Sequence, residues 1–134
     1  MYKHIIILLI IILFSSCSSI NDPLYPFYSD EELMEFREIA WNDLSMNEIE
    51  TVIILKEESK IQYATITRKD GIWYYRINDK NKYSFVLTNP NIDFRNDQWF
   101  VIVTINTSDD DLRRPIVVII EPNVKQVFGR GIRL

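Results

Sequence analysis

Histidine and cysteine are nearly absent from this chain, and their scarcity limits the chemistry available to it. The 134 residues include one histidine, His4, and one cysteine, Cys17. Catalytic schemes in which a histidine activates a serine or a cysteine therefore lack their base beyond the extreme N-terminus. Zinc sites built from histidine and cysteine are excluded in the same way. Because a lone cysteine forms no disulfide within the chain, the core and the strand pairing alone must hold the fold.

Glycine and positive charge are also scarce. Two of the three glycines, Gly129 and Gly131, flank Arg130, but the lysine and the serine or threonine that end a phosphate-binding loop do not follow. A bend at the end of a strand explains this segment better. The chain has 15 lysines and arginines against 19 acidic residues, for a net charge of -4. Nucleic-acid binding depends on a surplus of cationic side chains, so the composition argues against a nucleic-acid partner.

The N-terminal segment has the pattern of a secretory signal. Residues 5–14 are all apolar, Lys3 and His4 precede them, and residues 15–19 are small. A charged start, a short apolar run and small residues at a cleavage site are typical of a signal peptide. A membrane span needs about 20 apolar residues, and an amphipathic helix would carry polar positions at the helical period. We therefore expect residues 1–16 to be a signal peptide.

Leu13-Phe14-Ser15-Ser16-Cys17 resembles the lipobox of bacterial lipoproteins. The resemblance implies that Cys17 becomes the first mature residue and carries a diacylglyceryl group, with fatty-acid chains such as palmitate. Two or more such chains anchor a protein stably without crossing the bilayer. The implied location is the cell envelope. The outer membrane is favoured, because Ser18 stands where aspartate retains lipoproteins at the inner membrane of enteric-type bacteria.

The mature chain divides into a tether and one domain. Residues 17–28 contain two prolines among polar residues, which predicts a lipidated tether. Residues 29–134 suit a single domain. Its helix begins at Ser29, which forms a capping box with Glu32, and apolar residues then recur at the helical period. These residues are Leu33, Phe36, Ala40 and Leu44.

Strands are predicted after a second capping box, formed by Ser45 and Glu48, where the apolar period changes to two. Asp70 and Gly71 lie between two alternating segments and predict a hairpin with a two-residue turn. The predicted strands cover residues 51–56, 61–69, 72–77, 83–87, 99–105, 116–120 and 124–128.

This order of elements predicts an α+β fold, with the N-terminal helix packed on one face of an antiparallel sheet of about six strands. Residues 99–105 and 116–120 are apolar at nearly every position, as in central strands covered on both faces. Segments 99–103, 115–122 and 127–133 resemble small secreted bacterial domains of PepSY and cystatin-like layout, in which a helix precedes a curled sheet. The resemblance implies an envelope binding or inhibitory module without catalytic machinery.

The predicted hairpin separates a core face from a candidate binding face. The core face is expected to carry Ala64, Ile66, Trp73, Tyr75 and Ile77. The candidate binding face carries Thr65, Thr67, Tyr74 and Arg76. Exposed tyrosine and arginine are enriched at interfaces, so this face is predicted to contact an envelope protein or a glycan. Cross-strand packing of aromatic residues is the alternative.

Two acidic segments are candidate sites. Asp109, Asp110 and Asp111 offer oxygen ligands for calcium, but they lack the spacing of a dedicated calcium loop. A solvated turn neutralised by the arginines that follow is favoured, so no metal and no cofactor are expected. Asp93 and Asp97 in the loop before the fifth predicted strand could form a glycosidase pair, against the simpler interpretation of a polar loop.

The sequence therefore favours a membrane-anchored envelope lipoprotein that acts as a non-enzymatic binding module. One alternative is a carboxylate-dependent hydrolase of envelope material, which needs two acidic residues in one pocket. Another is a structural subunit of an envelope complex, which an exposed strand edge or apolar patch would favour.

Overall fold

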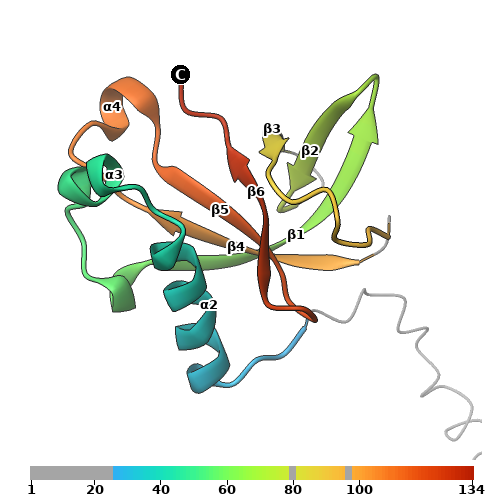
Figure 1. The fold of residues 1–134 in the computed structure, drawn as a ribbon, viewed down its shortest axis with the longest axis horizontal. Coiled ribbons are helices and arrows are strands. Elements are labelled where there is room, and N and C mark those ends of the chain that lie inside the picture. Colours follow the sequence, from blue (N-terminus) through green and yellow to red (C-terminus); the bar gives the residue numbers. More distant parts are fainter. Residues whose placement is uncertain (1–25, 79–80, 96–97) are drawn as a thin grey trace, which may run out of the picture.

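The computed structural model describes residues 26–78, 81–95 and 98–134. The predicted signal peptide, Cys17 and most of the predicted tether lie outside the described residues, as does Asp97. The helices are α2 (Asp30–Asn42), α3 (Met46–Thr51), the 3-10 helix η1 (Lys56–Glu58) and α4 (Asp110–Arg113). The strands are β1 (Lys60–Lys69), β2 (Ile72–Arg76), β3 (Lys82–Leu87), β4 (Trp99–Ile105), β5 (Ile116–Glu121) and β6 (Gln126–Gly131) (Figure 1).

The six strands close into an antiparallel barrel in the order β1-β2-β3-β6-β5-β4. The predicted α+β fold, with a helix on one face of an open sheet, is therefore wrong. The physical reason is the pairing of β1, whose ten residues form ladders with two neighbouring strands. Residues 60–65 pair with β4, and residues 65–69 pair with β2. The sheet consequently has an inside and an outside, and mostly strand structure surrounds its core.

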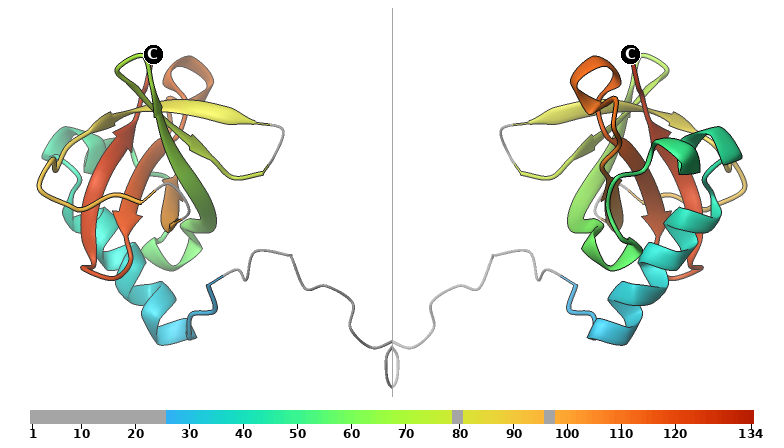
Figure 2. Two further views of the ribbon diagram at one scale, coloured as in Figure 1. Left: turned by 90° about the vertical axis from the view of Figure 1, so that its right-hand side faces the viewer. Right: turned by 90° about the vertical axis from the view of Figure 1, so that its left-hand side faces the viewer.

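Two apolar clusters result, one inside the barrel and one under α2. Phe100 and Ile102 of β4 point into the barrel, while Val101 and Val103 point outward into the second cluster. The interior cluster contains Ala64, Ile66, Tyr75, Phe85, Phe100, Ile102, Ile119 and Phe128. The outer cluster joins Phe36 and Ala40 of α2, and Leu44 just after it, to β4 and β5. The prediction that these two strands are covered on both faces is confirmed, and Figure 2 shows α2 on the outside of the barrel.

The helix starts and the hairpin turn predicted from the sequence are confirmed. Both capping boxes are present, at Ser29 and at Ser45. The hairpin turn is also confirmed, because Asp70 and Gly71 have φ of 53° and 78°, as a two-residue turn of this type requires. The expected first strand at residues 51–56 is wrong: only Val52 forms an isolated bridge, and a 3-10 helix follows.

The seam between β3 and β6 depends on a close approach at Gly129. This residue lies opposite Leu87 in a ladder of three residue pairs. A Cβ atom at position 129 would lie 2.5 Å from Cδ2 of Phe85 and 2.7 Å from the carbonyl oxygen of Val86. Only glycine leaves room for the Phe85 ring here.

We therefore expect Gly129→Ala to lower the free energy of unfolding by about 1–3 kcal/mol, because the added methyl overpacks the barrel wall. Chemical denaturation measures this change. Val86→Ala, on the same seam at a side chain that is 56% exposed, is the control and should change stability by less than about 0.5 kcal/mol. Equal losses in the two variants would contradict the steric argument.

Candidate functional site

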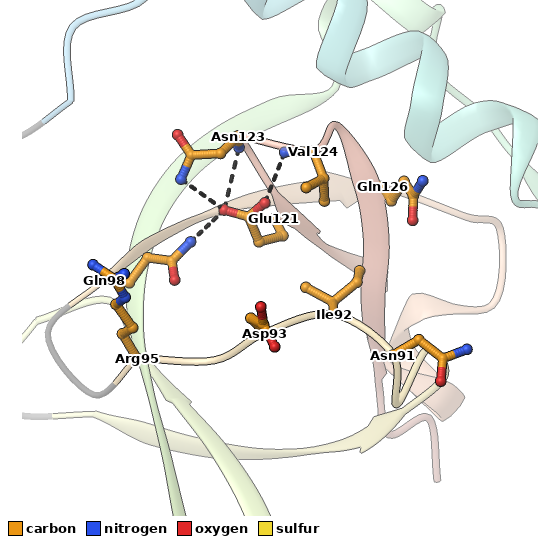
Figure 3. A pocket seen from close by; sticks show the side chains of 9 residues that line it. All are labelled: Asn91, Ile92, Asp93, Arg95, Gln98, Glu121, Asn123, Val124 and Gln126. Carbon is orange, nitrogen blue, oxygen red and sulfur yellow. Dashed lines mark hydrogen bonds between the residues drawn. The ribbon is translucent and has the colours of Figure 1, made fainter.

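The carboxamide pocket is a cavity of about 610 Å³ between the β5–β6 turn and the segment that leads into β4. It is lined by Asn91, Ile92, Asp93, Arg95, Gln98, Glu121, Asn123, Val124 and Gln126. Figure 3 shows the side chains of the β5–β6 turn on one side and those of residues 91–95 on the other. Four of the lining side chains are carboxamides, which combine hydrogen-bond donors with an acceptor.

Glu121 organises one wall of the carboxamide pocket. Its side chain is almost fully buried, with 2% exposed. Oε1 accepts hydrogen bonds from the backbone N–H of Asn123 (3.2 Å), from Nδ2 of Asn123 (2.9 Å) and from Nε2 of Gln98. Oε2 accepts a hydrogen bond from the backbone N–H of Val124 (2.8 Å). Both oxygens are thus occupied by groups of the same chain, and the carboxylate fixes the turn and Gln98.

Apolar and polar residues alternate along the opposite wall, and Ile92 of this wall both packs on the core and lines the pocket. Ile92 and Phe94 pack against the interior cluster, and Phe94 lies edge-on to Trp73 with ring centroids 5.3 Å apart. The polar residues between and beside them, Asp93 and Arg95, line the carboxamide pocket. This alternation in residues 91–95 is the sequence signal that could have located the site. The role of Glu121 was missed, because its partners come from separate segments.

The segment is also tied to β6. Asn89 accepts a hydrogen bond from the backbone N–H of Asn91 (3.2 Å) and donates one from Nδ2 to Oε1 of Gln126 (3.3 Å). The backbone N–H of Thr88 donates to the carbonyl of Phe128 (3.0 Å). These contacts hold the polar wall in place, so hydrogen bonds within the chain itself form the carboxamide pocket.

The pocket brings two carboxylates together, although they are not the pair that the sequence offered as an alternative to a polar loop. That pair was Asp93 with Asp97, and Asp97 lies outside the described residues. In the structure, Asp93 shares the carboxamide pocket with Glu121 instead (Figure 3). Because Glu121 already accepts four hydrogen bonds, only Asp93 presents a carboxylate without such commitments to the space between them.

The predicted binding face lies elsewhere, on the outside of β1 and β2. Thr65 is paired with Arg76, and Thr67 with Tyr74, as the hairpin register predicted. Nζ of Lys82 lies 4.2 Å from the centroid of the Tyr74 ring. The four residues are thus neighbours on one surface, and their role in binding stays a prediction.

The acidic cluster at residues 109–111 anchors the C-terminal tail. Oδ1 of Asp109 accepts a hydrogen bond from Nη2 of Arg133 (2.7 Å), and Oγ1 of Thr107 lies 2.6 Å from the same oxygen. Asp110 accepts hydrogen bonds from the backbone N–H of Thr107 (3.0 Å) and from Nδ2 of Asn106 (2.9 Å). Asp111 is exposed. Within the described ranges, no three acidic, histidine or cysteine side chains converge as a metal site.

Comparison with known proteins adds no assignment: no family model, no curated protein and no solved structure matches this chain. In the part of the chain that the structure describes, no helix has both the length and the apolar character needed to cross a membrane.

We expect Asp109 to make the stability of the tail depend on pH. The hydrogen bond from Thr107, together with Arg133, lowers the pKa of Asp109 below its ordinary value of 3.8. A carboxyl group whose pKa is lowered in the folded protein stabilises the fold fully at a pH above its ordinary pKa. This stabilisation is lost as the pH falls through the lowered pKa. Thermal unfolding between pH 7 and pH 2 should show Asp109→Asn less stable than the wild type at pH 7, with the difference disappearing at the acid end.

Asp111→Asn removes an exposed carboxylate from the same turn and is the matched control. It should follow the wild type at every pH. A constant difference between Asp109→Asn and the wild type down to pH 2 would contradict the assigned role of the Asp109 carboxylate.

Proposed function

We propose that this protein is a lipid-anchored binding module of the bacterial cell envelope that takes a neutral glycan in the carboxamide pocket. The observation that carries the proposal is a pocket with four carboxamide side chains around a carboxylate whose oxygens are already occupied. Sugar hydroxyls both donate and accept hydrogen bonds, and carboxamides complement both functions.

Charge argues against an anionic ligand. Asp93 and Glu121 outnumber Arg95 among the charged residues of the lining, and the oxygens of Glu121 are turned to its own donors. Ile92 and Val124 add apolar surface, which suits the carbon faces of a sugar ring. A pocket with a few placed polar groups on partly apolar walls is the usual form of a small-molecule site.

The anchor is proposed from the sequence around Cys17, and the described start of the domain is compatible with it. Tyr28 packs edge-on against Phe36 with ring centroids 5.0 Å apart, and it lies 6.0 Å from Tyr63. The residues between Cys17 and Tyr28 would span up to roughly 35 Å when extended. That length is enough to hold the domain clear of lipid headgroups.

Hydrolysis of envelope glycans is the second candidate, because Asp93 and Glu121 line the same pocket. Glycoside hydrolysis uses two carboxylates on either side of the scissile bond. Glu121 would have to release some of its four hydrogen bonds to take part, and this cost favours binding over catalysis. The two functions differ in one readout, the release of new reducing ends from a bound oligosaccharide.

We expect the mature protein to begin at Cys17 and to carry a diacylglyceryl group on its sulfur. Mass spectrometry of the protein purified from bacterial membranes should give an N-terminal peptide that starts at Cys17 with added lipid mass. Cys17→Ala should leave the protein without lipid. A native chain that retains Met1 and has no added mass would contradict the anchor.

We expect the full mature protein, held in detergent, to bind neutral oligosaccharides on a glycan array. Asn91→Ala removes one pocket carboxamide without touching Glu121, so affinity should fall roughly 3- to 10-fold, the value of one hydrogen bond. Arg76→Ala, on the outer face of β2, is the control and should bind as the wild type does. Loss of binding in the control alone would favour the face formed by Thr65, Thr67, Tyr74 and Arg76.

The same samples test the second candidate. Reducing-end release that disappears in Asp93→Asn would replace the binding proposal with hydrolysis. Retained binding without release in the wild type would support the binding module.

A further inference from the structure

A second pocket, of about 450 Å³, lies at the opposite ends of β5 and β6 from the carboxamide pocket. The ladder between β3 and β6 covers only residues 85–87 and 129–131, so the start of β3 diverges from the chain after β6. The pocket occupies this notch. It is lined by Tyr75, Lys82, Tyr83, Ser84, Arg114, Pro115, Val117, Gly131 and Ile132. We call it the cationic pocket.

The lining of the cationic pocket is positively charged. Among the residues that the structure describes, Lys82 and Arg114 line it and no acidic residue does, and the ammonium of Lys82 lies 4.2 Å from the centroid of the Tyr74 ring. Among the described residues, neither cation forms an ion pair with a carboxylate within 4.0 Å. The whole chain has a net charge of -4, so acidic side chains are abundant elsewhere. A cavity whose described lining holds two cationic residues in a protein of negative net charge is suited to an anion.

Aromatic rings form one wall of the same cavity. Tyr75 and Tyr83 are stacked, with ring centroids 5.2 Å apart and planes 25° apart. Tyr75 is buried, whereas Tyr83 is 41% exposed. Stacked rings of which one remains exposed offer a surface for a planar or apolar group beside the charged one.

Arg114 is held in a backbone conformation that favours glycine. Its φ is 70° and its ψ is 158°, a region in which a side chain costs energy and which occurs mostly at functional sites. It ends α4 and precedes Pro115, which excludes a helical ψ. Its N–H donates to the carbonyl of Asp110 (2.9 Å), and its own carbonyl accepts from Nε of Arg133 (3.0 Å). These two backbone contacts thus hold Arg114 in the strained conformation. An arginine occupies the position although glycine would adopt this conformation without strain.

We infer that the cationic pocket binds an organic anion whose carboxylate or phosphate group lies against Arg114 and whose planar or apolar part packs on Tyr83. The guanidinium of Arg114 is suited to an oxyanion, and Lys82 adds positive charge to the lining. The hydroxyl of Ser84 adds a polar group to the lining, and Val117 and Ile132 add apolar surface. This site is separate from the carboxamide pocket and takes a ligand of a different class.

The test is calorimetric titration of the full purified protein with four probes. Phenyl phosphate and benzoate should bind, benzyl alcohol should not, and inorganic phosphate should bind at least tenfold more weakly than phenyl phosphate. Absence of phenyl phosphate and benzoate binding would overturn the inference. Equal binding of inorganic and phenyl phosphate would overturn the aromatic part and leave the anion part supported.

Three variants locate the site and separate charge from strain. Arg114→Gly and Arg114→Ala should each weaken phenyl phosphate binding at least tenfold. Arg113→Ala removes the same charge from the neighbouring residue outside the pocket and should bind as the wild type does. A loss in Arg113→Ala as large as that in Arg114→Ala would overturn the inference by reducing the effect to net charge.

Stability gives an independent readout. Arg114→Gly should unfold at a temperature a few degrees higher than Arg114→Ala, because glycine adopts this conformation without strain. An Arg114→Gly variant that is more stable and binds no phenyl phosphate would support an arginine retained for its ligand. Unchanged binding in that variant would overturn the assignment of Arg114.

Discussion

The structure depends on the pairing of one long strand with two partners. β1 pairs with β4 through its first half and with β2 through its second half, and this double pairing closes the barrel. Closure leaves none of the six described strands at an edge of the sheet. It also turns Phe85, Phe100 and Phe128 toward one another, and the last two rings lie 4.9 Å apart. Because aromatic side chains fill the interior, the space for ligands lies at the ends of the barrel.

Both pockets lie at the ends of the barrel because its interior is filled. The carboxamide pocket lies where β5 turns into β6, and the cationic pocket lies where β3 and β6 separate. In both pockets, residues that belong to the interior cluster or pack against it also form part of the lining. Ile92 lines the carboxamide pocket beside Asp93, and Tyr75 lines the cationic pocket. The core therefore positions the polar groups of each site.

Much of the local structure could be predicted from the sequence, because its causes are local. Ser29 with Glu32, and Asp70 with Gly71, specify a helix start and a turn within four residues. Closure could not be predicted, because it joins β1 to β4 across a large separation and no periodicity encodes it. The strand expected at residues 51–56 failed because only Val52 finds a partner there.

The site residues divide in the same way. The outward placement of Tyr74 and Arg76 followed from the register of the hairpin. The importance of Glu121 did not, because Gln98 reaches it from 23 residues away. The positive φ of Arg114 could not be predicted from the sequence either. Its position before a proline disfavours a helical conformation there, but the sign of φ depends on contacts made by Asp110 and Arg133.

The ion pair between Lys125 and Glu35 holds one end of the barrel beside α2. It joins the β5–β6 turn to α2 with Nζ and Oε2 2.6 Å apart, so the carboxamide pocket lies at the end where the chain enters the fold (Figure 1). In a protein anchored through Cys17, that end would lie on the side of the membrane. The cationic pocket beside Tyr83 would lie on the opposite side. The first pocket would then open toward material at the membrane surface, and the second toward dissolved molecules.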